Sequence, residues 1–423
     1  MPLFFLGLRD AVGGGRAQLH ARRCIPMHLP ALPVSDDKPL LRRVGPKSQT
    51  EELTCRNLYA GFRPSAPQTL VCALGAASAD SAQAATKVGW LWASQPTDTS
   101  PYAADPSYSY NSASGAITIS RLGMGHYQVD FAGLGVNALA SNVQLSAYGT
   151  NGYCASAGWG SKGAGNGALM WVTCFDPNGN LADAKFTLLY QSYTSPIGNG
   201  ERGRALVYDG APSSIFTPTS YTYNSTGGTN SIVHNGSGNY TIVMPGLVGN
   251  GGHVQVTALV DYGSPSTPGA RCKVYGWSTD LAGTTAAIQC FNKAGAYSDE
   301  QFSFAYTLGE SLAGNGTATK LDAYEWANNP VATKRYDPDK TYVYNGFGTG
   351  RLTSVMGSTG VYTTTIPNSP GFSTSNVLVT AFGNDNAYCN TGFWGNTTID
   401  VQCYAQGGSP ALSVFDMNFQ ASQ

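Results

Sequence analysis

Charged residues are scarce in this chain, and they form no basic stripe. Only 12% of the 423 residues are Asp, Glu, Lys or Arg, and the formal net charge is −1. Residues 1–86 carry ten Lys and Arg against six Asp and Glu, whereas residues 87–423 carry fourteen against nineteen. Because nothing in the larger part could neutralise a row of phosphates, we expect no nucleic-acid partner.

Long apolar runs and common catalytic signatures are also missing. No stretch reaches the roughly 18 apolar residues of a membrane-spanning helix, so we expect no membrane span. The chain has no Gly-x-Ser-x-Gly, His-Glu-x-x-His, phosphate-binding loop or dinucleotide-binding motif. It has no Cys-x-x-Cys spacing either, which disfavours zinc. We therefore expect no metal and no cofactor, and we favour a non-catalytic protein over an enzyme.

What the chain does contain is a pattern of about 115 residues that occurs three times. In each copy a Cys is followed by a Trp, a second Cys, a Phe and a further aromatic residue at constant offsets, apart from the Trp-to-Cys distance. The three series are Cys154, Trp159, Cys174, Phe186 and Tyr190; Cys272, Trp277, Cys290, Phe302 and Tyr306; and Cys389, Trp394, Cys403, Phe415 and Phe419. Each copy is long enough to be a domain of its own.

The cysteines predict both a disulfide scheme and a compartment. Six of the nine cysteines belong to the repeats, and pairing within each copy is the one scheme that recurs. We therefore predict the disulfides Cys154–Cys174, Cys272–Cys290 and Cys389–Cys403. Disulfides persist in oxidising compartments, so we expect a secreted, extracellular protein.

An export signal is visible only in part. The stretch from Thr69 to Ala84 has a short apolar core and ends in Ala82-Gln83-Ala84, a small-x-small cleavage pattern. The segment before it is rich in Arg and Pro and has no periodic pattern. Two interpretations stay open: an overextended start ahead of a signal peptide, or a disordered N-terminal extension. Residues 1–85 are thus predicted to be a non-globular leader, disordered or removed.

Within each copy, alternating apolar residues predict short strands. Tyr127, Val129 and Phe131 share one face, and Gly-rich breaks separate such runs. Seven or eight strands per copy indicate an all-β fold of three tandem antiparallel β-sandwiches, immunoglobulin-like or jelly-roll-like. Linker-like Gly-Asn-Gly segments at 194–203 and 309–319 place the sandwiches at residues 86–198, 199–317 and 318–423.

The repeats, with segments such as SYTYNSTGG, YTIVMPGL and VQVTA before the Cys–Trp–Cys series, resemble uncharacterised tandem repeats in secreted proteins of high-GC bacteria. The resemblance covers roughly residues 87–423. It implies secretion and a β fold. It implies no activity, because that group has no assigned catalytic residues to carry over.

Histidines and carboxylates are weak candidates for a site. His126, His234 and His253 are not repeated between copies, so we interpret them as lone surface histidines. The segment Asp176-Pro-Asn178-Gly-Asn180 is weakly similar to a calcium loop, but a hairpin turn explains its Pro, Asn and Gly better. Asp183 and Asp299 occupy equivalent positions, and we interpret them as solvated turn residues.

Repeated aromatic residues are the remaining candidates. A tryptophan beside a disulfide is typical of a sandwich core, so Trp159, Trp277 and Trp394 are interpreted as core residues rather than as ligand platforms. Tyr102, Phe216 and Tyr336 lie in equivalent Pro-flanked loops, where they either pack on proline or bind a ligand. They are the only ligand-binding residues predicted.

These observations favour a secreted, non-catalytic binding or adhesion protein that recognises a glycan or another extracellular macromolecule. The first alternative is a secreted polysaccharide or peptide hydrolase whose site is built from unrepeated loop residues. The second alternative is a structural spacer. An aromatic surface would favour binding, whereas a cleft with converging carboxylates would favour the enzyme.

Overall fold

The computed structural model describes residues 87–136, 140–163, 166–192, 203–207, 215–218, 220–261, 269–309, 312, 322–369 and 374–422. The predicted leader, its cleavage site and most of both predicted linkers lie outside these residues. So do Cys24, Cys55 and Cys72. The positions of the two boundaries between repeats therefore stay predictions.

Nearly all of the described chain is β-structure, as the alternating pattern predicts. The first repeat forms β1 (Lys87–Ala93), β2 (Tyr102–Ala103), β3 (Tyr110–Asn111), β4 (Ile117–Gly123), β5 (His126–Ala132), β6 (Ser141–Tyr148), β7 (Tyr153–Ser161), β8 (Gly167–Phe175) and β9 (Lys185–Ser192). The second forms β10 (Gly203–Val207), β11 (Ile215–Phe216), β12 (Thr222–Asn224), β13 (Ser231–Gly236), β14 (Asn239–Pro245), β15 (His253–Leu259), β16 (Arg271–Thr279), β17 (Gly283–Phe291) and β18 (Gln301–Thr307).

The third repeat follows the same order. It forms β19 (Asp322–Ala327), β20 (Val343–Asn345), β21 (Thr353–Ser358), β22 (Val361–Thr365), β23 (Ser375–Phe382), β24 (Tyr388–Gly395), β25 (Thr398–Tyr404) and β26 (Val414–Ala421). Two single 3-10 turns, η1 (Pro106–Tyr108) and η2 (Lys340–Tyr342), precede β3 and β20. None of the described segments is a helix long and apolar enough to span a membrane.

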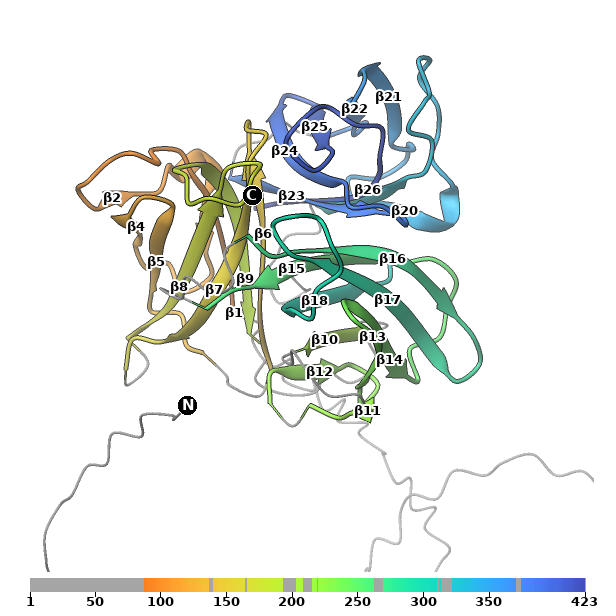
Figure 1. Cartoon of the computed structure of the whole chain (residues 1–423), viewed down its shortest axis with the longest axis horizontal. Helices are drawn as coiled ribbons and strands as arrows, with labels where there is room; N and C mark the ends of the chain where they lie inside the picture. The colour runs from red at the N-terminus through yellow and green to blue at the C-terminus, as the bar shows by residue number, and fades with distance from the viewer. Residues whose placement is uncertain are drawn as a thin grey trace, which may run out of the picture. The chain divides into compact units, whose positions relative to one another are not determined.

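Each repeat contributes two groups of strands and has its own apolar cluster (Figure 1). In the first repeat, β1, β3, β6 and β9 form the group that we call the inner strands, and β2, β4, β5, β7 and β8 form the outer strands. Among the outer strands, β5 alternates between half-buried and buried residues along its whole length. Its buried positions face the cluster because side chains of a strand point to opposite faces in turn.

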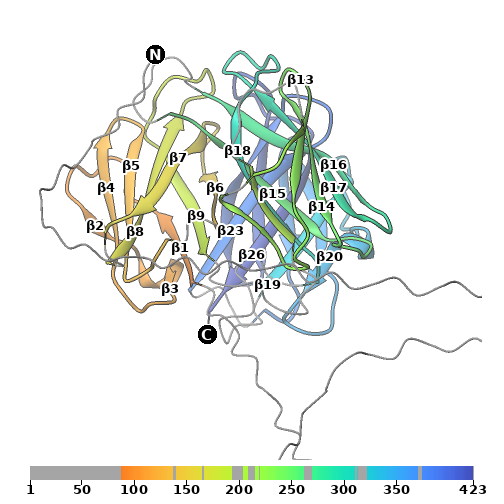
Figure 2. The ribbon, with the colours of Figure 1, turned by 90° about the horizontal axis from the view of Figure 1, so that it is seen from below.

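The sheets do not end at the repeats. The three sheets have the orders β21-β22-β25-β24-β6-β9-β1-β3, β12-β10-β18-β15-β7-β8-β5-β4-β2 and β11-β13-β14-β17-β16-β23-β26-β19-β20. In each sheet the outer strands of one repeat continue into the inner strands of another. The neighbouring strands at these places are β7 and β15, β16 and β23, and β24 and β6. Figure 2 shows β6, β15 and β23 close together in the middle of the molecule. We call each place where strands of two repeats meet in one sheet a joint. The joints link repeat 1 to repeat 2, repeat 2 to repeat 3 and repeat 3 back to repeat 1, so they form a closed cycle.

All three joints have the same local structure. A short parallel bridge pairs Ser156 with Leu259, Val274 with Phe382, and Thr391 with Tyr148. The carbonyls of Ser156, Val274 and Thr391 accept hydrogen bonds from the amides of Val260, Gly383 and Gly149 at 2.8, 2.9 and 2.8 Å. This equivalence relates the repeats by an approximate threefold axis, and residues 77–423 form one compact unit.

The inner strands β6, β15 and β23 are buried on both faces. Their apolar residues face the clusters, while their polar residues face the centre of the cycle, where the three repeats meet. There the amides of Leu145, Val256 and Val379 donate to the hydroxyls of Thr257, Thr380 and Ser146 at 3.0, 3.2 and 2.8 Å. Each hydroxyl belongs to the repeat next to that of the amide it binds, so the same hydrogen bond occurs three times around the axis.

Candidate binding site at the repeat junctions

The three predicted ligand-binding residues lie on the outermost parts of the three sheets. Tyr102 in β2 and Phe216 in β11 are half-buried and pack against the apolar clusters of their repeats. Tyr336 pairs with Ser354 beside β21. The hydroxyls of Tyr102 and Tyr336 accept hydrogen bonds from the amides of Gln95 and Asn329, and burial raises the pKa of both tyrosines. This packing supports the alternative of a structural role, and a role in binding stays a prediction.

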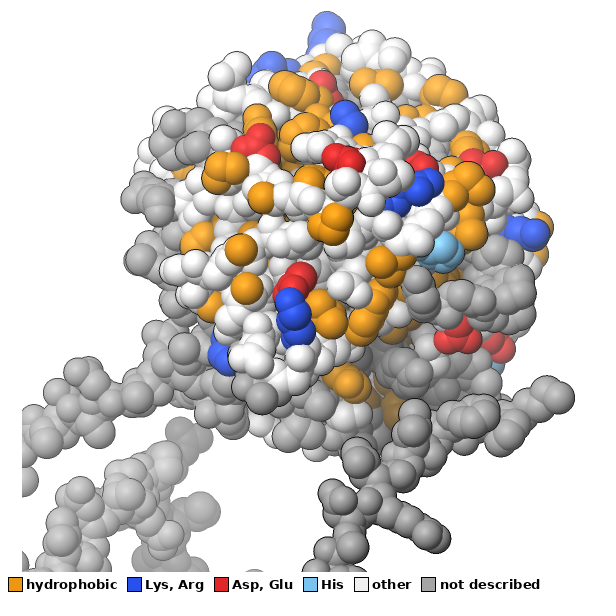
Figure 3. Space-filling model, turned by 90° about the vertical axis from the view of Figure 1, so that its left-hand side faces the viewer, with side chains coloured by type: hydrophobic (Ala, Val, Ile, Leu, Met, Phe, Trp, Pro, Cys, Tyr) orange, Lys and Arg blue, Asp and Glu red, His pale blue; other side chains and the backbone are white. Residues whose placement is uncertain are grey.

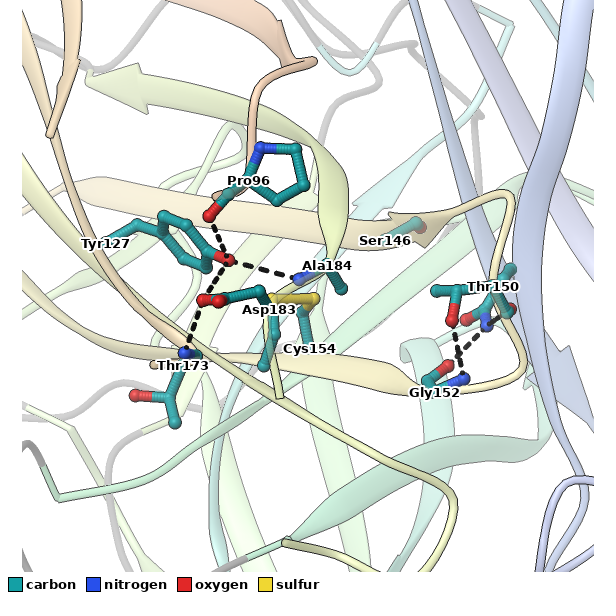
Figure 4. Close-up of a disulfide and its surroundings, with 12 residues drawn as sticks. Pro96, Tyr127, Ser146, Thr150, Gly152, Cys154, Thr173, Asp183 and Ala184 are labelled. Carbon is teal, nitrogen blue, oxygen red and sulfur yellow. Dashed lines mark hydrogen bonds between the residues drawn. A yellow bond between two sulfur atoms is a disulfide. The ribbon is translucent and has the colours of Figure 1, made fainter. Parts of the chain in front are cut away.

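The three disulfides form as predicted, Cys154–Cys174, Cys272–Cys290 and Cys389–Cys403. Each joins the two antiparallel strands that carry it, and the paired cysteines lie directly opposite each other. Figure 4 shows the first disulfide beside the Tyr127 and Asp183 side chains. All three pairings were thus predicted correctly from the positions of the cysteines.

A β-bulge separates each disulfide from its tryptophan. The bulges lie between Ser156 and Trp159, between Val274 and Gly276, and between Thr391 and Phe393, directly after the bridge to the next repeat. Bulges bend and re-aim a strand. Here they place each tryptophan against aromatic or apolar residues of the following repeat. Trp394 is buried, as expected for a core residue, but Trp159 and Trp277 are only half-buried.

As a result, aromatic side chains from equivalent positions of the repeats lie together where one repeat meets the next. Between repeats 2 and 3, Trp277 lies edge-on to Trp326, Tyr342 and Phe382 with ring centroids 6.1, 5.3 and 5.7 Å away. Between repeats 3 and 1 the equivalent residues are Trp394, Trp92, Tyr108 and Tyr148. Between repeats 1 and 2, Trp159 lies edge-on to Tyr221. Tyr208, which occupies the position of Trp92 and Trp326 in the second repeat, lies outside the described residues.

The junction between repeats 2 and 3 contains a pocket of about 80 Å³. Its lining consists of Gly276, Trp277, Trp326, Tyr342 and Phe382. A Cβ added to Gly276 would meet no atom within 4 Å, so this glycine opens the pocket. In the third repeat, Phe393 takes the same position in the bulge, directly before Trp394.

Polar groups around this pocket have unequal partners. The indole N–H of Trp277 donates to the carbonyl of Gly251 at 3.0 Å, which fixes the ring. The indole nitrogen of Trp326 is buried and has no hydrogen-bond partner among the described residues. The lining of the pocket therefore consists of four aromatic rings and a glycine, and the Trp326 indole nitrogen is buried away from the pocket space.

His253 corrects our interpretation of the histidines as lone surface residues. It is fully buried at the inner face of β15, where its Nδ1 lies 3.7 Å from Oδ1 of Asp416. Burial lowers the pKa of His253 to about 3, so this imidazole is neutral near pH 7, and burial raises the pKa of Asp416 well above its ordinary value. His126 and His234 are half-buried, with contacts to Thr173 and Asp299 respectively. No periodic signal distinguishes an inward-facing histidine from an exposed one.

Asp183 and Asp299 are not the freely solvated turn residues that we predicted. The Asp183 carboxylate accepts hydrogen bonds from Arg121, the Gly125 amide and the Tyr127 hydroxyl. Figure 4 shows the bond from Tyr127. Asp299 similarly accepts from the Gly238 amide and contacts His234. Both carboxylates therefore tie the hairpin of β4 and β5, or of β13 and β14, to the segment before the last strand of the repeat.

The prediction of a hairpin turn at Asp176 is confirmed. Its Oδ1 accepts from the amides of Asn178 and Asn180 at 2.8 and 2.9 Å, a side-chain-stabilised turn. Among the described residues, no group of three or more His, Cys, Asp and Glu side chains could hold a metal ion. Comparisons with family models, curated proteins and solved structures give no match for this chain.

Proposed function

We propose that the protein is an extracellular, non-catalytic carbohydrate-binding protein built from three β-sandwich domains, with its binding site at the junction of the second and third. The observation that carries this proposal is the open aromatic pocket around Gly276, in a position that recurs at the other two junctions. Three disulfides suit the oxidising environment outside a cell.

The chemistry of the pocket suits a sugar more than a charged ligand. Aromatic rings present apolar faces to the C–H groups of a pyranose, and the tyrosine hydroxyl can hydrogen-bond to its hydroxyl groups. Among the described residues, no Lys, Arg, Asp or Glu lines the pocket. At about 80 Å³ it is much smaller than the several hundred Å³ of a site that encloses a whole ligand. We therefore expect it to hold one edge of a sugar, or an apolar substituent such as an acetamido methyl group.

The outer surface gives the same preference for an uncharged partner. On the face shown in Figure 3, acidic and basic side chains lie singly or in small mixed groups, with hydrophobic side chains between them. Such a surface has no extended field of one sign to attract a polyanion. The most strongly buried carboxylates, Glu325 and Asp416, are enclosed in the protein and cannot reach a bulky substrate.

A glycan array with the purified protein tests this proposal, and the variant Gly276→Phe tests the site. The substitution introduces the phenylalanine found at the equivalent position of repeat 3, in a place where a Cβ meets nothing. It should fill the pocket and lower the affinity for any bound glycan at least tenfold. Gly123→Phe is the matched control, because Gly123 also has open space and ordinary backbone angles but lies in β4, a strand of a different sheet from the one that carries the pocket.

The outcomes separate the three functional classes. Binding that survives Gly123→Phe and is lost in Gly276→Phe supports the proposal. Equal binding by both variants would place the site elsewhere and contradict our assignment. Release of reducing ends or peptides from a retained polymer would favour the hydrolase, and no retention on any glycan would favour the structural spacer.

A further inference from the structure

The outer strands of the first repeat carry a tryptophan that does not belong to the core. Met170 and Val172 of β8 are part of the apolar cluster of the repeat, and Trp171 between them points to the opposite face of the sheet. Trp171 is half-buried on that face. The residue three positions before the second cysteine is Ala287 in repeat 2 and Asp400 in repeat 3, so the shared fold does not require an aromatic ring there.

The indole of Trp171 extends along the surface of the sheet instead of standing upright from it. Its ring carbons Cζ3 and Cη2 lie 3.7 and 3.8 Å from the place that a Cβ of Gly160 would occupy. Gly160 belongs to the neighbouring strand β7, where it pairs with Leu169 and not with Trp171. The ring therefore reaches across to the next strand, and the glycine leaves room for it. Gly158 adds open space, since a Cβ there would meet no atom within 4 Å.

Two polar groups beside the ring have no partner in the protein. Gln128 of β5 is the direct cross-strand neighbour of Trp171, and its side-chain amide forms no hydrogen bond with any described residue. The indole N–H of Trp171 is likewise unpaired within the described part of the chain, and unlike that of Trp326 it is not buried. The amide supplies a donor and an acceptor, and the indole supplies a second donor. Both groups are therefore open to a ligand that carries hydroxyl groups.

Charges around the ring are balanced. Asp130 of β5 and Lys162, which follows β7, form an ion pair with each other. His126 contacts the Thr173 hydroxyl at 3.1 Å, and burial lowers the pKa of His126 below its ordinary 6.5, so this ring is neutral near pH 7. Figure 3 shows the molecule from the side on which β2, β4 and β5 lie in Figure 1, and most of that surface is uncharged. An uncharged ligand suits this face better than an ionic one.

We propose that this face of repeat 1, with Trp171 at its centre, is a second carbohydrate-binding site that takes an uncharged polysaccharide chain. The inference shares only the class of ligand with the proposed function, because β8 belongs to a different sheet from the strand that carries the pocket at Gly276. The indole stacks on the C–H face of one pyranose, while Gln128 and the indole N–H bond to hydroxyl groups of the chain. An open sheet face binds a unit within a long chain, since it encloses neither end of the polymer.

Affinity electrophoresis of the full chain, in gels with and without a soluble polysaccharide, tests the proposal. The probes are a mixed-linkage β-glucan, a glucomannan and an arabinoxylan, none of which carries charged units. At least one of them should retard the unaltered protein. Trp171→Ala introduces the residue of repeat 2, so the fold should persist, and the affinity should fall at least about tenfold. Trp171→Phe is the matched control, because it keeps a ring and should keep most of the retardation.

Oxidative labelling of tryptophans in the unaltered protein, read by mass spectrometry, gives a second measurement that does not depend on any variant. The polymer that retards the protein should protect Trp171, whereas protection of Trp277 reports on the pocket at Gly276. Protection of Trp277 alone, with equal retardation of Trp171→Ala, would overturn the second site and leave the pocket standing. Protection of Trp171 alone would support the second site and contradict the pocket. If none of the three polymers retards the protein, the second site is wrong, whatever the glycan array shows.

Discussion

Replacing Glu325 by Gln should change the pH dependence of stability. Glu325 in β19 is completely buried, and its Oε1 accepts hydrogen bonds from the hydroxyls of Ser354 and Thr364. Its Oε2 has no partner among the described residues. Burial, opposed by these two hydrogen bonds, raises the pKa of Glu325 from its ordinary 4.5 to about 7.

The sign and size of the effect follow from linkage. A raised pKa in the folded state means that the protonated carboxyl stabilises the fold fully below 4.5 and that this stabilisation is lost as the pH rises through 7. The difference between 4.5 and 7 corresponds to about 3 kcal/mol. Gln is neutral throughout, keeps the acceptor and has nearly the same volume. Glu325→Gln should therefore be close to neutral at low pH and up to about 3 kcal/mol more stable above pH 8.

Urea unfolding at about pH 5 and about pH 8.5, with the disulfides intact, measures this difference. The contribution of His253 is common to both proteins and cancels when the two are compared at one pH. The charge of Glu325 also raises the pKa of Asp416, so Glu325→Gln removes this repulsion as well, which adds to the stabilisation at high pH. Asp337→Asn, an exposed carboxylate, serves as the control and should shift stability equally at both pH values. If Glu325→Gln differs from the unaltered protein by the same amount at both pH values, Glu325 is not the titrating group and the reasoning fails.

Three further changes have defined expectations. Tyr102→Ala and Tyr336→Ala should each lower the free energy of unfolding by about 1–3 kcal/mol, because half-buried rings and their hydrogen bonds are lost; an unchanged Tm would instead mean that these rings are free surface groups. Asp183→Asn should cost about 1–3 kcal/mol in chemical denaturation, since Arg121 and the Gly125 amide lose a charged acceptor, whereas Leu412→Asn at the equivalent position of repeat 3 should cost little. Thr257→Val and Thr380→Val should destabilise by similar amounts, about 1–3 kcal/mol each, because each leaves one buried amide unpaired; clearly unequal losses would contradict the approximate threefold relation.

Local features of the fold were predictable from the sequence, whereas contacts between repeats were not. The cysteine pairs join neighbouring strands of one hairpin, so spacing alone identified them. The apolar face of β5 followed from its alternation. The polar residues of β6 also alternate, which ordinarily indicates a solvated face. That face is buried because another repeat covers it, and no single-copy pattern contains this information.

In the candidate site, too, features within one repeat were predictable and contacts between repeats were not. The tryptophans stood out by their repetition, but their exposure depends on bulges that follow the joint to the next repeat. One signal bears on the pocket at Gly276: repeats 1 and 2 have glycine directly before the tryptophan, Gly158 and Gly276, whereas repeat 3 has Phe393. Arg271, which lines a cavity where equivalent residues of all three repeats meet, carried a comparable signal, because the other two repeats have tyrosine at its position. Differences between copies were thus as informative as identities.

Joining three copies in one polypeptide allows the axis to hold a residue that a symmetric trimer could not. In an assembly of three identical chains every residue beside the axis occurs three times, so an arginine at the place of Arg271 would bring three guanidinium groups together. Their mutual repulsion in a buried site would prevent closure. With the copies covalently linked, one arginine can lie beside the rings of Tyr153 and Tyr388, which contact each other, while the other two positions stay uncharged. Duplication within a chain therefore permits a single charge at the centre of an otherwise threefold arrangement.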